Sequence, residues 1–170
     1  AYEGDTGPNT GGMGTYSDVD HSLPFLTKHD IIQAHEINMA TAKALKNKFG
    51  DGYKGILYGG FITTADGVKL IEYNARFGDP EAMNVLSILE SDFIEICNGI
   101  ADGRLNKVDV CFKNKATVCK YAVPEGYPDN PIKGKSIDIT KIENPDGLFY
   151  ASVDVLNGKL VEAGSRTIAV

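Results

Sequence analysis

The sequence predicts an α+β fold, because helical and alternating apolar patterns both occur and are unevenly distributed along the chain. Residues 28–49 have an imperfect helical face, and residues 54–64 and 68–75 have the composition of two strands joined by a turn. From about residue 105 the pattern changes to short β-like runs separated by turn residues: 116–123, 136–140, 148–156 and 159–170. We therefore place a boundary near residues 102–115, between an α+β part and a small β-rich part.

Both expected helices have recognisable ends. Thr27 is expected to cap helix 28–49, and Gly50 lies where a glycine favours the end of a helix. A second helix should follow Asp79 and Pro80, with the aspartate as its cap and the proline in its first turn. Its apolar positions continue without a break to the turn residues after Cys97: Met83, Leu86, Ile88, Leu89, Phe93, Ile94 and Cys97. The sequence thus predicts one helix from Pro80 to about Asn98.

The two strands before this helix are predicted to form a hairpin. Asp66-Gly67 favours a type I′ turn, in which both central residues need a positive φ. A two-residue loop at these positions places Glu72 opposite Phe61, whereas a three-residue loop places it opposite Gly60. Neither register adds another carboxylate beside Glu72.

Composition and charge narrow the possible partners. The 170 residues are 42% hydrophobic and 24% charged, as expected of a globular protein, and the net charge is -6. Such a surface does not favour nucleic acid or an anionic membrane as a partner. The cysteines, Cys97, Cys111 and Cys119, lack C-x-x-C spacing, so we expect buried structural thiols and a cytoplasmic location. No apolar run is long enough for a transmembrane helix.

The most specific candidate for a metal and phosphate site is the run Glu72-Tyr73-Asn74-Ala75-Arg76. On a strand, Glu72, Asn74 and Arg76 point to the same face, with neighbours roughly 6–7 Å apart. Two oxygen ligands at this separation can hold magnesium together with nucleotide phosphates, and the arginine can hold a phosphate or an acyl phosphate. The same alternation also fits a half-exposed strand with incidental surface charges.

Two further segments present polar groups. Gly78 and Asp79 precede a predicted helix N-terminus, which favours anions, although Asp79 can instead be a simple cap, the commoner role for this residue type. Residues 4–14, GDTGPNTGGMG, include five glycines among eleven residues, so backbone N–H groups there could converge on a ligand. This loop lacks the G-K-[ST] ending of a P-loop, and its composition alone favours a flexible surface loop.

Taken together, these segments resemble the phosphoribosylamine–glycine ligase family of the ATP-grasp superfamily. GDTGPNTGGMG, GILYGGF, IEYNARFGDPE and the later Gly126-Tyr127-Pro128 occur in the family's order and at similar spacing, along essentially the whole chain. The resemblance implies that residues 1–115 are the later part of an ATP-grasp module, an antiparallel sheet with helices. It also implies that residues 116–170 are a small β-rich C-terminal domain, truncated at its end.

The resemblance further implies a reaction and a site. ATP would convert glycine to glycyl phosphate, which the amine of 5-phosphoribosylamine attacks to give glycinamide ribonucleotide, ADP and phosphate in purine biosynthesis. Glu72 and Asn74 match the family's metal ligands for Mg²⁺ or Mn²⁺. Arg76 and Asp79 match residues expected to act in catalysis. The substrate-binding set implied in the same way consists of Asp5, Asn9, Gly78 and Asp79.

The expected partners follow from the same resemblance. They are ATP, glycine, 5-phosphoribosylamine and a missing N-terminal portion of the same enzyme, so the chain alone is expected to be inactive. Two other interpretations remain open. One is another ATP-grasp ligase or carboxylase of purine metabolism, in which GDTGPNTGGMG and NARFGDPE are not usual. The other is a folding fragment without catalytic function.

Overall fold

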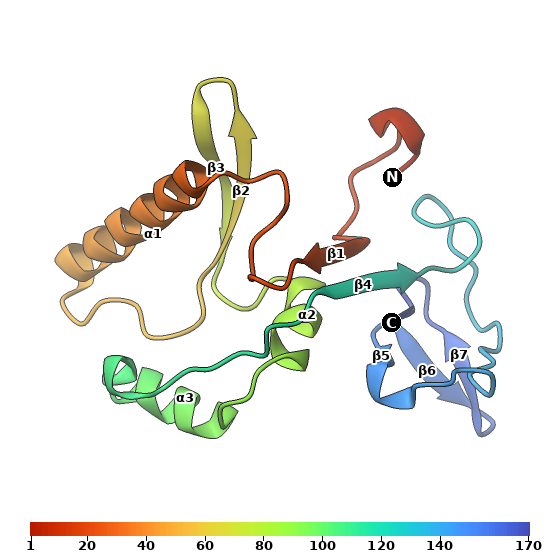
Figure 1. Cartoon of the computed structure of the whole chain (residues 1–170). Coiled ribbons are helices and arrows are strands. Elements are labelled where there is room, and N and C mark those ends of the chain that lie inside the picture. The colour runs from red at the N-terminus through yellow and green to blue at the C-terminus, as the bar shows by residue number, and fades with distance from the viewer. The chain divides into compact units, whose positions relative to one another are not determined.

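The chain forms two compact units, and each unit is assembled from separate stretches of sequence. The computed structural model describes the backbone of residues 1–170 and every side chain except that of Asp5. Unit 1 consists of Ala1–Tyr16, Asp79–Asn84 and Val118–Val170, and unit 2 of Ser17–Gly78 and Val85–Thr117. The helices and antiparallel strands of both units, drawn in Figure 1, confirm the α+β prediction.

Unit 2 is built on a helix that packs against a hairpin. The helix α1 (Lys28–Phe49) contacts β3 (Gly67–Asn74), which pairs antiparallel with β2 (Tyr58–Thr64) (Figure 1). The packed face of the helix is polar as well as apolar, since the Gln33 side chain accepts a hydrogen bond from the Val68 backbone N–H (3.1 Å). This bond fixes the helix at the start of β3.

The helix predicted over residues 28–49 is confirmed, together with both of its ends. Thr27 Oγ1 accepts a hydrogen bond from the Asp30 N–H (3.2 Å), and Asp30 Oδ2 accepts one from the Thr27 N–H (2.8 Å). This reciprocal pair is a capping box, and its hydrogen bonds hold the pKa of Asp30 below the ordinary value. Gly50 ends the helix with φ of 82°, and its N–H donates to the Lys46 carbonyl (2.9 Å).

The predicted hairpin forms, but its turn differs from the prediction. The loop consists of residues 65–66, and Gly67 is the one turn residue with a positive φ (93°). A type I′ turn at the predicted positions is wrong, because the residue before Gly67 would also need a positive φ. A register shift between Gly60 and Phe61 then brings Glu72 opposite Gly60, the partner expected for a longer loop.

The single helix predicted after Pro80 is wrong. Two helices occupy this stretch, α2 (Glu81–Ser87) and α3 (Phe93–Ala101). Between them the Ile88 carbonyl accepts a hydrogen bond from the Lys113 N–H (2.8 Å), and Asp92 then caps α3 through a backbone N–H of its first turn (2.8 Å). The apolar periodicity continues across the break, so the pattern alone did not reveal it.

Unit 1 is organised by a sheet with the strand order β1-β4-β8-β5. The short strand β8 pairs antiparallel with β4 on one side and with β5 on the other. A separate antiparallel hairpin consists of β6 and β7 (Figure 1). The bounds of these strands are β1 (Gly14–Ser17), β4 (Thr117–Ala122), β5 (Phe149–Tyr150), β6 (Val153–Leu156), β7 (Lys159–Glu162) and β8 (Ile168–Ala169).

Most of the predicted β-like runs contain strands. Runs 116–123, 148–156 and 159–170 contain strands, but run 136–140 contributes only an isolated bridge to β7. The turn Asn157-Gly158, with φ of 52° and 74°, joins β6 to β7 with both residues at positive φ. The strand β1 was not predicted.

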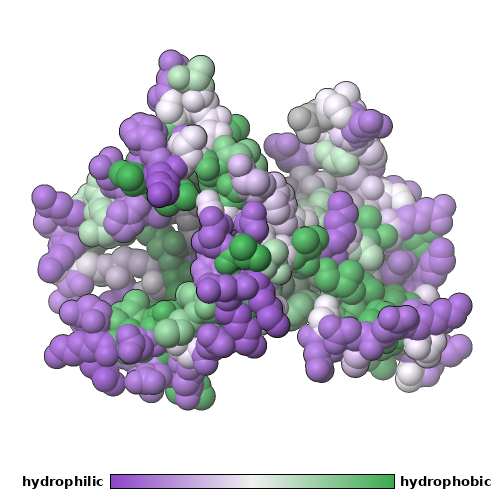
Figure 2. Space-filling view, in the orientation of Figure 1, coloured by the Kyte–Doolittle hydropathy of each residue, from purple (hydrophilic) through white to green (hydrophobic). Residues whose placement is uncertain are grey.

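The hydrophobic core is small and much apolar surface stays exposed. In unit 1, Cys119, Tyr121 and Ala169 form a buried cluster with Met83 and Phe149 packed against it. In unit 2, a cavity of about 430 Å³ lies between α1 and the β2–β3 hairpin and is lined mainly by apolar side chains. Figure 2 shows hydrophobic patches among hydrophilic residues on the face it draws.

The cysteines differ in burial. All three are free thiols, and Cys119 is buried as expected, but Cys97 and Cys111 are exposed, so the prediction of buried structural thiols is wrong for these two.

Within the part of the chain that the structure describes, no helix is both long and apolar enough to cross a membrane.

Replacing the cap of α1 tests the contribution of local hydrogen bonds. Thr27→Ala should lower the free energy of unfolding by about 1 kcal/mol, because it removes the acceptor for the Asp30 N–H. Thr27→Ser keeps a hydroxyl and should retain the native stability. Urea titrations followed by circular dichroism at 222 nm measure both. Equal urea midpoints for the alanine variant and the native chain would contradict the assigned cap.

Candidate active site

Two candidate metal ligands lie side by side on β3 in unit 2. The Asn74 amide nitrogen donates a hydrogen bond to Glu72 Oε1 (2.9 Å). Glu72 is exposed and Asn74 is half-buried, so both polar groups are accessible at the C-terminal end of the strand. The hydrogen bond directs the amide nitrogen to the carboxylate and leaves the amide oxygen for another partner. The strand alternation therefore brings this pair together, as the sequence predicts.

The oxygen atoms of this pair are of the types that bind magnesium. No group of three or more His, Cys, Asp or Glu residues that could hold a metal ion occurs among the described residues. Glu72 and Asn74 supply a carboxylate and a carboxamide oxygen, which are ligand types that Mg²⁺ accepts. Because Mg²⁺ commonly completes its six-fold shell with water and substrate phosphates, two protein ligands are sufficient.

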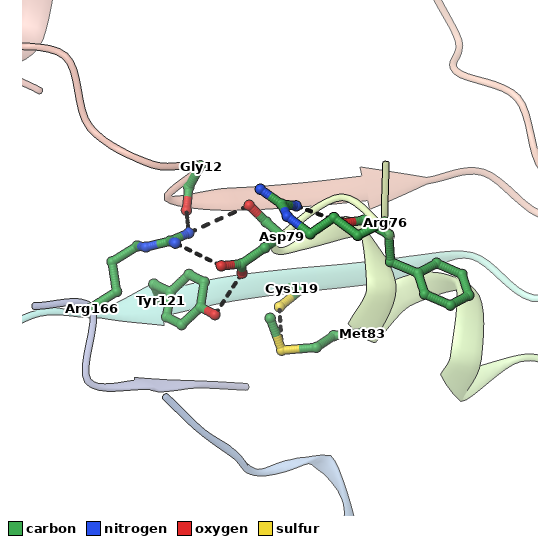
Figure 3. Close-up of polar contacts among 8 residues, drawn as sticks. Gly12, Arg76, Asp79, Met83, Cys119, Tyr121 and Arg166 are labelled. Atoms are coloured by element: carbon green, nitrogen blue, oxygen red, sulfur yellow. Dashed lines mark hydrogen bonds and ion pairs between the residues drawn. The ribbon is translucent and has the colours of Figure 1, made fainter. Parts of the chain in front are cut away.

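Arg76 lies beyond the end of β3, so the strand alternation does not extend to it. The strand ends at Asn74, and the Arg76 side chain turns to its neighbour, where Nη1 donates to the Phe77 carbonyl (2.6 Å) (Figure 3). The side chain is exposed. A guanidinium has five N–H donors, so this bond leaves Arg76 able to bind an anion.

Asp79 belongs to unit 1, where its carboxylate is held by two side chains. Oδ1 accepts a hydrogen bond from the Tyr121 hydroxyl (2.7 Å), and Oδ2 pairs with Nη2 of Arg166 (2.6 Å) (Figure 3). The predicted cap role is therefore wrong, since α2 begins at Glu81 and the carboxylate is directed to other partners. The Asp79 side chain is 42% exposed, so it remains accessible to a ligand.

Arg166 also binds the Gly-rich loop of unit 1. Its Nη1 donates to the Gly12 carbonyl (2.7 Å), and the guanidinium lies over the Tyr121 ring at 4.6 Å from the ring centroid. Figure 3 shows the four groups from Gly12, Asp79, Tyr121 and Arg166 pointing toward one another. The loop is therefore attached to the same cluster as Asp79 rather than only exposed at the surface.

Burial, together with the nearby Asp79 carboxylate, raises the pKa of two side chains of β4, Tyr121 and Cys119. Burial, the hydrogen bond to Asp79 and the negative charge of Asp79 raise the pKa of Tyr121 to about 12, against the opposing positive charge of Arg166. Burial is also the main cause that raises the pKa of Cys119, with smaller contributions from Asp79 and Glu81. Tyr121 is thus a neutral phenol at physiological pH and donates its proton to the Asp79 carboxylate.

The remaining predicted substrate residues occupy different environments. Asn9 is exposed in the Gly-rich loop, and Gly78 is buried at the end of a unit 2 stretch. The side chain of Asp5 lies outside the described residues. The structure thus brings Glu72 together with Asn74, and it joins Asp79 to the loop through Arg166.

Sequence reasoning missed both partners of Asp79. Tyr121 lies on a predicted strand, two residues after Cys119, and only the burial of that face distinguishes it. Arg166 lies between β7 and β8, in a stretch without any motif. A single arginine within the predicted run 159–170 does not indicate a functional role, so the sequence offered no specific signal for Arg166.

The sequence is similar to a family of ATP-grasp domains and to named ligases. Residues 1–82 match the family described as phosphoribosylglycinamide synthetase, ATP-grasp (A) domain. The whole chain is 57% identical to a phosphoribosylamine–glycine ligase of Methanocaldococcus jannaschii and 53% identical to one of Methanosarcina barkeri. The chain is thus similar along its entire length to members of the phosphoribosylamine–glycine ligase family, as the sequence motifs predict.

A solved structure supports the same fold. The crystal structure of a phosphoribosylamine–glycine ligase from Thermotoga maritima matches 98% of this chain with a TM-score of 0.77 and 31% sequence identity. The match covers 40% of that chain. Likewise, this chain spans 39% of the length of each of the two relatives from Methanocaldococcus jannaschii and Methanosarcina barkeri.

Tyr121→Phe tests the shifted phenol. The folded state holds the Tyr121 proton more tightly than the unfolded state, whose pKa is near 10.0, so its contribution is complete below pH 10. That contribution should be lost as pH rises from 10 toward about 12, by at most about 1.4 kcal/mol per pH unit. Urea unfolding at pH 9, 10 and 11 should show a shallower pH dependence for Tyr121→Phe.

The control for this measurement is Tyr150→Phe, which removes an exposed phenol on β5. This variant should keep the native pH dependence of the unfolding free energy. Parallel pH dependences for the native chain and Tyr121→Phe would show that the pKa of Tyr121 is not raised in the folded protein.

Proposed function

We propose that this chain forms part of an ATP-dependent ligase that joins glycine to 5-phosphoribosylamine in de novo purine biosynthesis. The observation that carries this proposal is the similarity along the entire chain to relatives with the name phosphoribosylamine–glycine ligase. The Glu72–Asn74 pair supports it, because this pair offers oxygen ligands at an accessible strand end.

The proposed reaction has two steps. The γ-phosphoryl group of ATP is transferred to a carboxylate oxygen of glycine, which gives glycyl phosphate and ADP. The amine nitrogen of 5-phosphoribosylamine then attacks the carbonyl carbon of glycyl phosphate. The bond between this carbon and the phosphate oxygen breaks, and the nitrogen loses a proton. Phosphoryl transfer of this kind depends on positioning and on neutralisation of charge, so the relevant protein groups are cations, metal ligands and hydrogen-bond donors.

Each site residue has a defined part in this proposal. Glu72 and Asn74 hold Mg²⁺ or Mn²⁺, which when bound neutralises phosphate charge on ATP. Arg76 steadies the transferred phosphate or glycyl phosphate with its remaining N–H donors. Asp79 accepts a hydrogen bond from the amine substrate, for which its 42% exposure leaves room. The remaining substrate-binding set, assigned by family likeness, is Asp5, Asn9 and Gly78.

Domain organisation and cellular setting are part of the same proposal. Residues 1–115 form the later part of the ATP-grasp module, and residues 116–170 form the small β-rich domain. The ATP-grasp match over residues 1–82 supports the first assignment. The greater length of the relatives supports a further portion of the same enzyme as a partner, without which these residues are inactive. The free thiols support a cytoplasmic location.

The direct test is an assay of the protein that carries this sequence. It is supplied with magnesium, ATP, glycine and 5-phosphoribosylamine, and products are separated by mass spectrometry. We expect glycinamide ribonucleotide and ADP in equal amounts, only when all substrates are present. Turnover of another carboxylate in place of glycine would instead identify a different ATP-grasp ligase. Failure to form glycinamide ribonucleotide would refute the proposed function.

Glu72→Gln tests the metal pair. The substitution removes the negative charge and keeps the size, so the affinity for magnesium–ATP should fall roughly tenfold to hundredfold. Titration calorimetry of the same protein measures this affinity. Glu36→Gln removes an exposed carboxylate on α1 and should leave the affinity unchanged. If Glu72→Gln and Glu36→Gln bind magnesium–ATP equally well, Glu72 is not a metal ligand.

A further inference from the structure

Arg166 is more enclosed than any other charged partner in the described ion pairs. Its side chain is 18% exposed, whereas the side chains of the pairs Arg104–Asp102 and Lys135–Glu125 are all more than half exposed. An arginine loses hydration when it is buried to this extent, so its hydrogen bonds must be satisfied by the protein. Such an environment indicates that the contacts of Arg166 are specific.

The contacts of Arg166 use the shape of the guanidinium as well as its charge. Nη2 pairs with Asp79 Oδ2 (2.6 Å), and Nη1 donates to the Gly12 carbonyl (2.7 Å) and lies 3.4 Å from the Asp79 carbonyl oxygen. The flat face of the group lies over the Tyr121 ring. A lysine ammonium could keep the charge but could not reproduce the fork and the stacking together.

The Gly-rich loop fits closely around this arginine. A Cβ atom at Gly11 would lie 2.7 Å from Cζ of Arg166, and one at Gly12 would lie 2.6 Å from Cδ of Pro80. Both distances are too short for non-bonded carbon atoms. The loop therefore lies so close to the guanidinium and to Asp79-Pro80 that a side chain at either glycine would displace a neighbouring group.

We propose that Arg166 is a positioning residue for the amine substrate, because it fixes the Gly11–Gly12 backbone and the Asp79 carboxylate in one geometry. The proposal rests on the proposed function in assigning Asp79 and the loop to that substrate. Each carboxylate oxygen of Asp79 accepts one hydrogen bond in the structure and has capacity for another. Arg166 thus orients the acceptor without occupying all of it.

The principal test is Arg166→Lys in the protein that carries this sequence. Loss of the fork should misplace Asp79 and the loop, and the KM for 5-phosphoribosylamine should rise about tenfold or more. The KM values for ATP and glycine should stay within about twofold. A purely structural role would lower the active fraction, and so kcat, with unchanged KM values. An unchanged KM for the amine, or an equal rise in all three, would overturn the proposal.

A second readout does not depend on turnover. Nitrogen-15 relaxation measures the backbone order parameters of Gly11 and Gly12, which should fall from about 0.85 to below about 0.6 in Arg166→Lys. Unchanged order parameters would overturn the proposed link between the arginine and the loop. If the native protein forms no glycinamide ribonucleotide, the proposed function fails, and the relaxation data still decide whether Arg166 orders the loop.

Two further variants serve as a control and as a replacement in the test of Arg166. Arg104→Lys alters an exposed arginine–aspartate pair of unit 2 (2.8 Å) and should leave both readouts unchanged. If Arg166→Lys does not fold, Gly11→Ala replaces it, because the added methyl group displaces the guanidinium while Arg166 itself is kept. The same selective rise in the KM for the amine is expected. Native KM values in Gly11→Ala would contradict the proposal.

Discussion

The ion pair between Asp79 and Arg166 is the interaction on which the arrangement of the candidate site residues in unit 1 depends. It joins the turn after β3 to the segment between β7 and β8, 87 positions apart in the sequence. The same arginine holds the Gly-rich loop through Gly12 and covers Tyr121 on β4. Because charge-assisted hydrogen bonds are roughly twice as strong as neutral ones, a single side chain can keep four distant segments together.

This constraint explains the composition of the Gly-rich loop. A high glycine content usually indicates conformational freedom, and on composition alone the loop resembles a flexible surface segment. In the structure, Gly11 and Gly12 instead permit close approach to Arg166 and to the Asp79-Pro80 backbone. The absence of side chains is therefore a packing requirement. Glycines at these two positions and the guanidinium form one fitted contact.

The features predicted correctly from the sequence are those fixed by neighbouring residues. The cap at Thr27 and the turn between the predicted runs 148–156 and 159–170 each involve residues within a few positions of one another. The features that were missed depend on distant partners. The break before α3 is stabilised by a bond to Lys113, and Arg166 gains its role only when residues 12 and 79 are brought to it. Local patterns contain no information about these contacts.

The two candidate carboxylates, Glu72 and Asp79, have different electrostatic surroundings, which suits them to different ligands. Glu72 accepts a hydrogen bond from the neutral amide of Asn74, so its negative charge is not compensated by that partner. Asp79 faces a guanidinium at 2.6 Å, so most of its charge is balanced within the protein. A divalent cation is attracted to the uncompensated group. Under the proposed function, Glu72 is therefore the better ligand for a metal ion, and Asp79, whose charge is paired with Arg166, remains a hydrogen-bond acceptor for the amine.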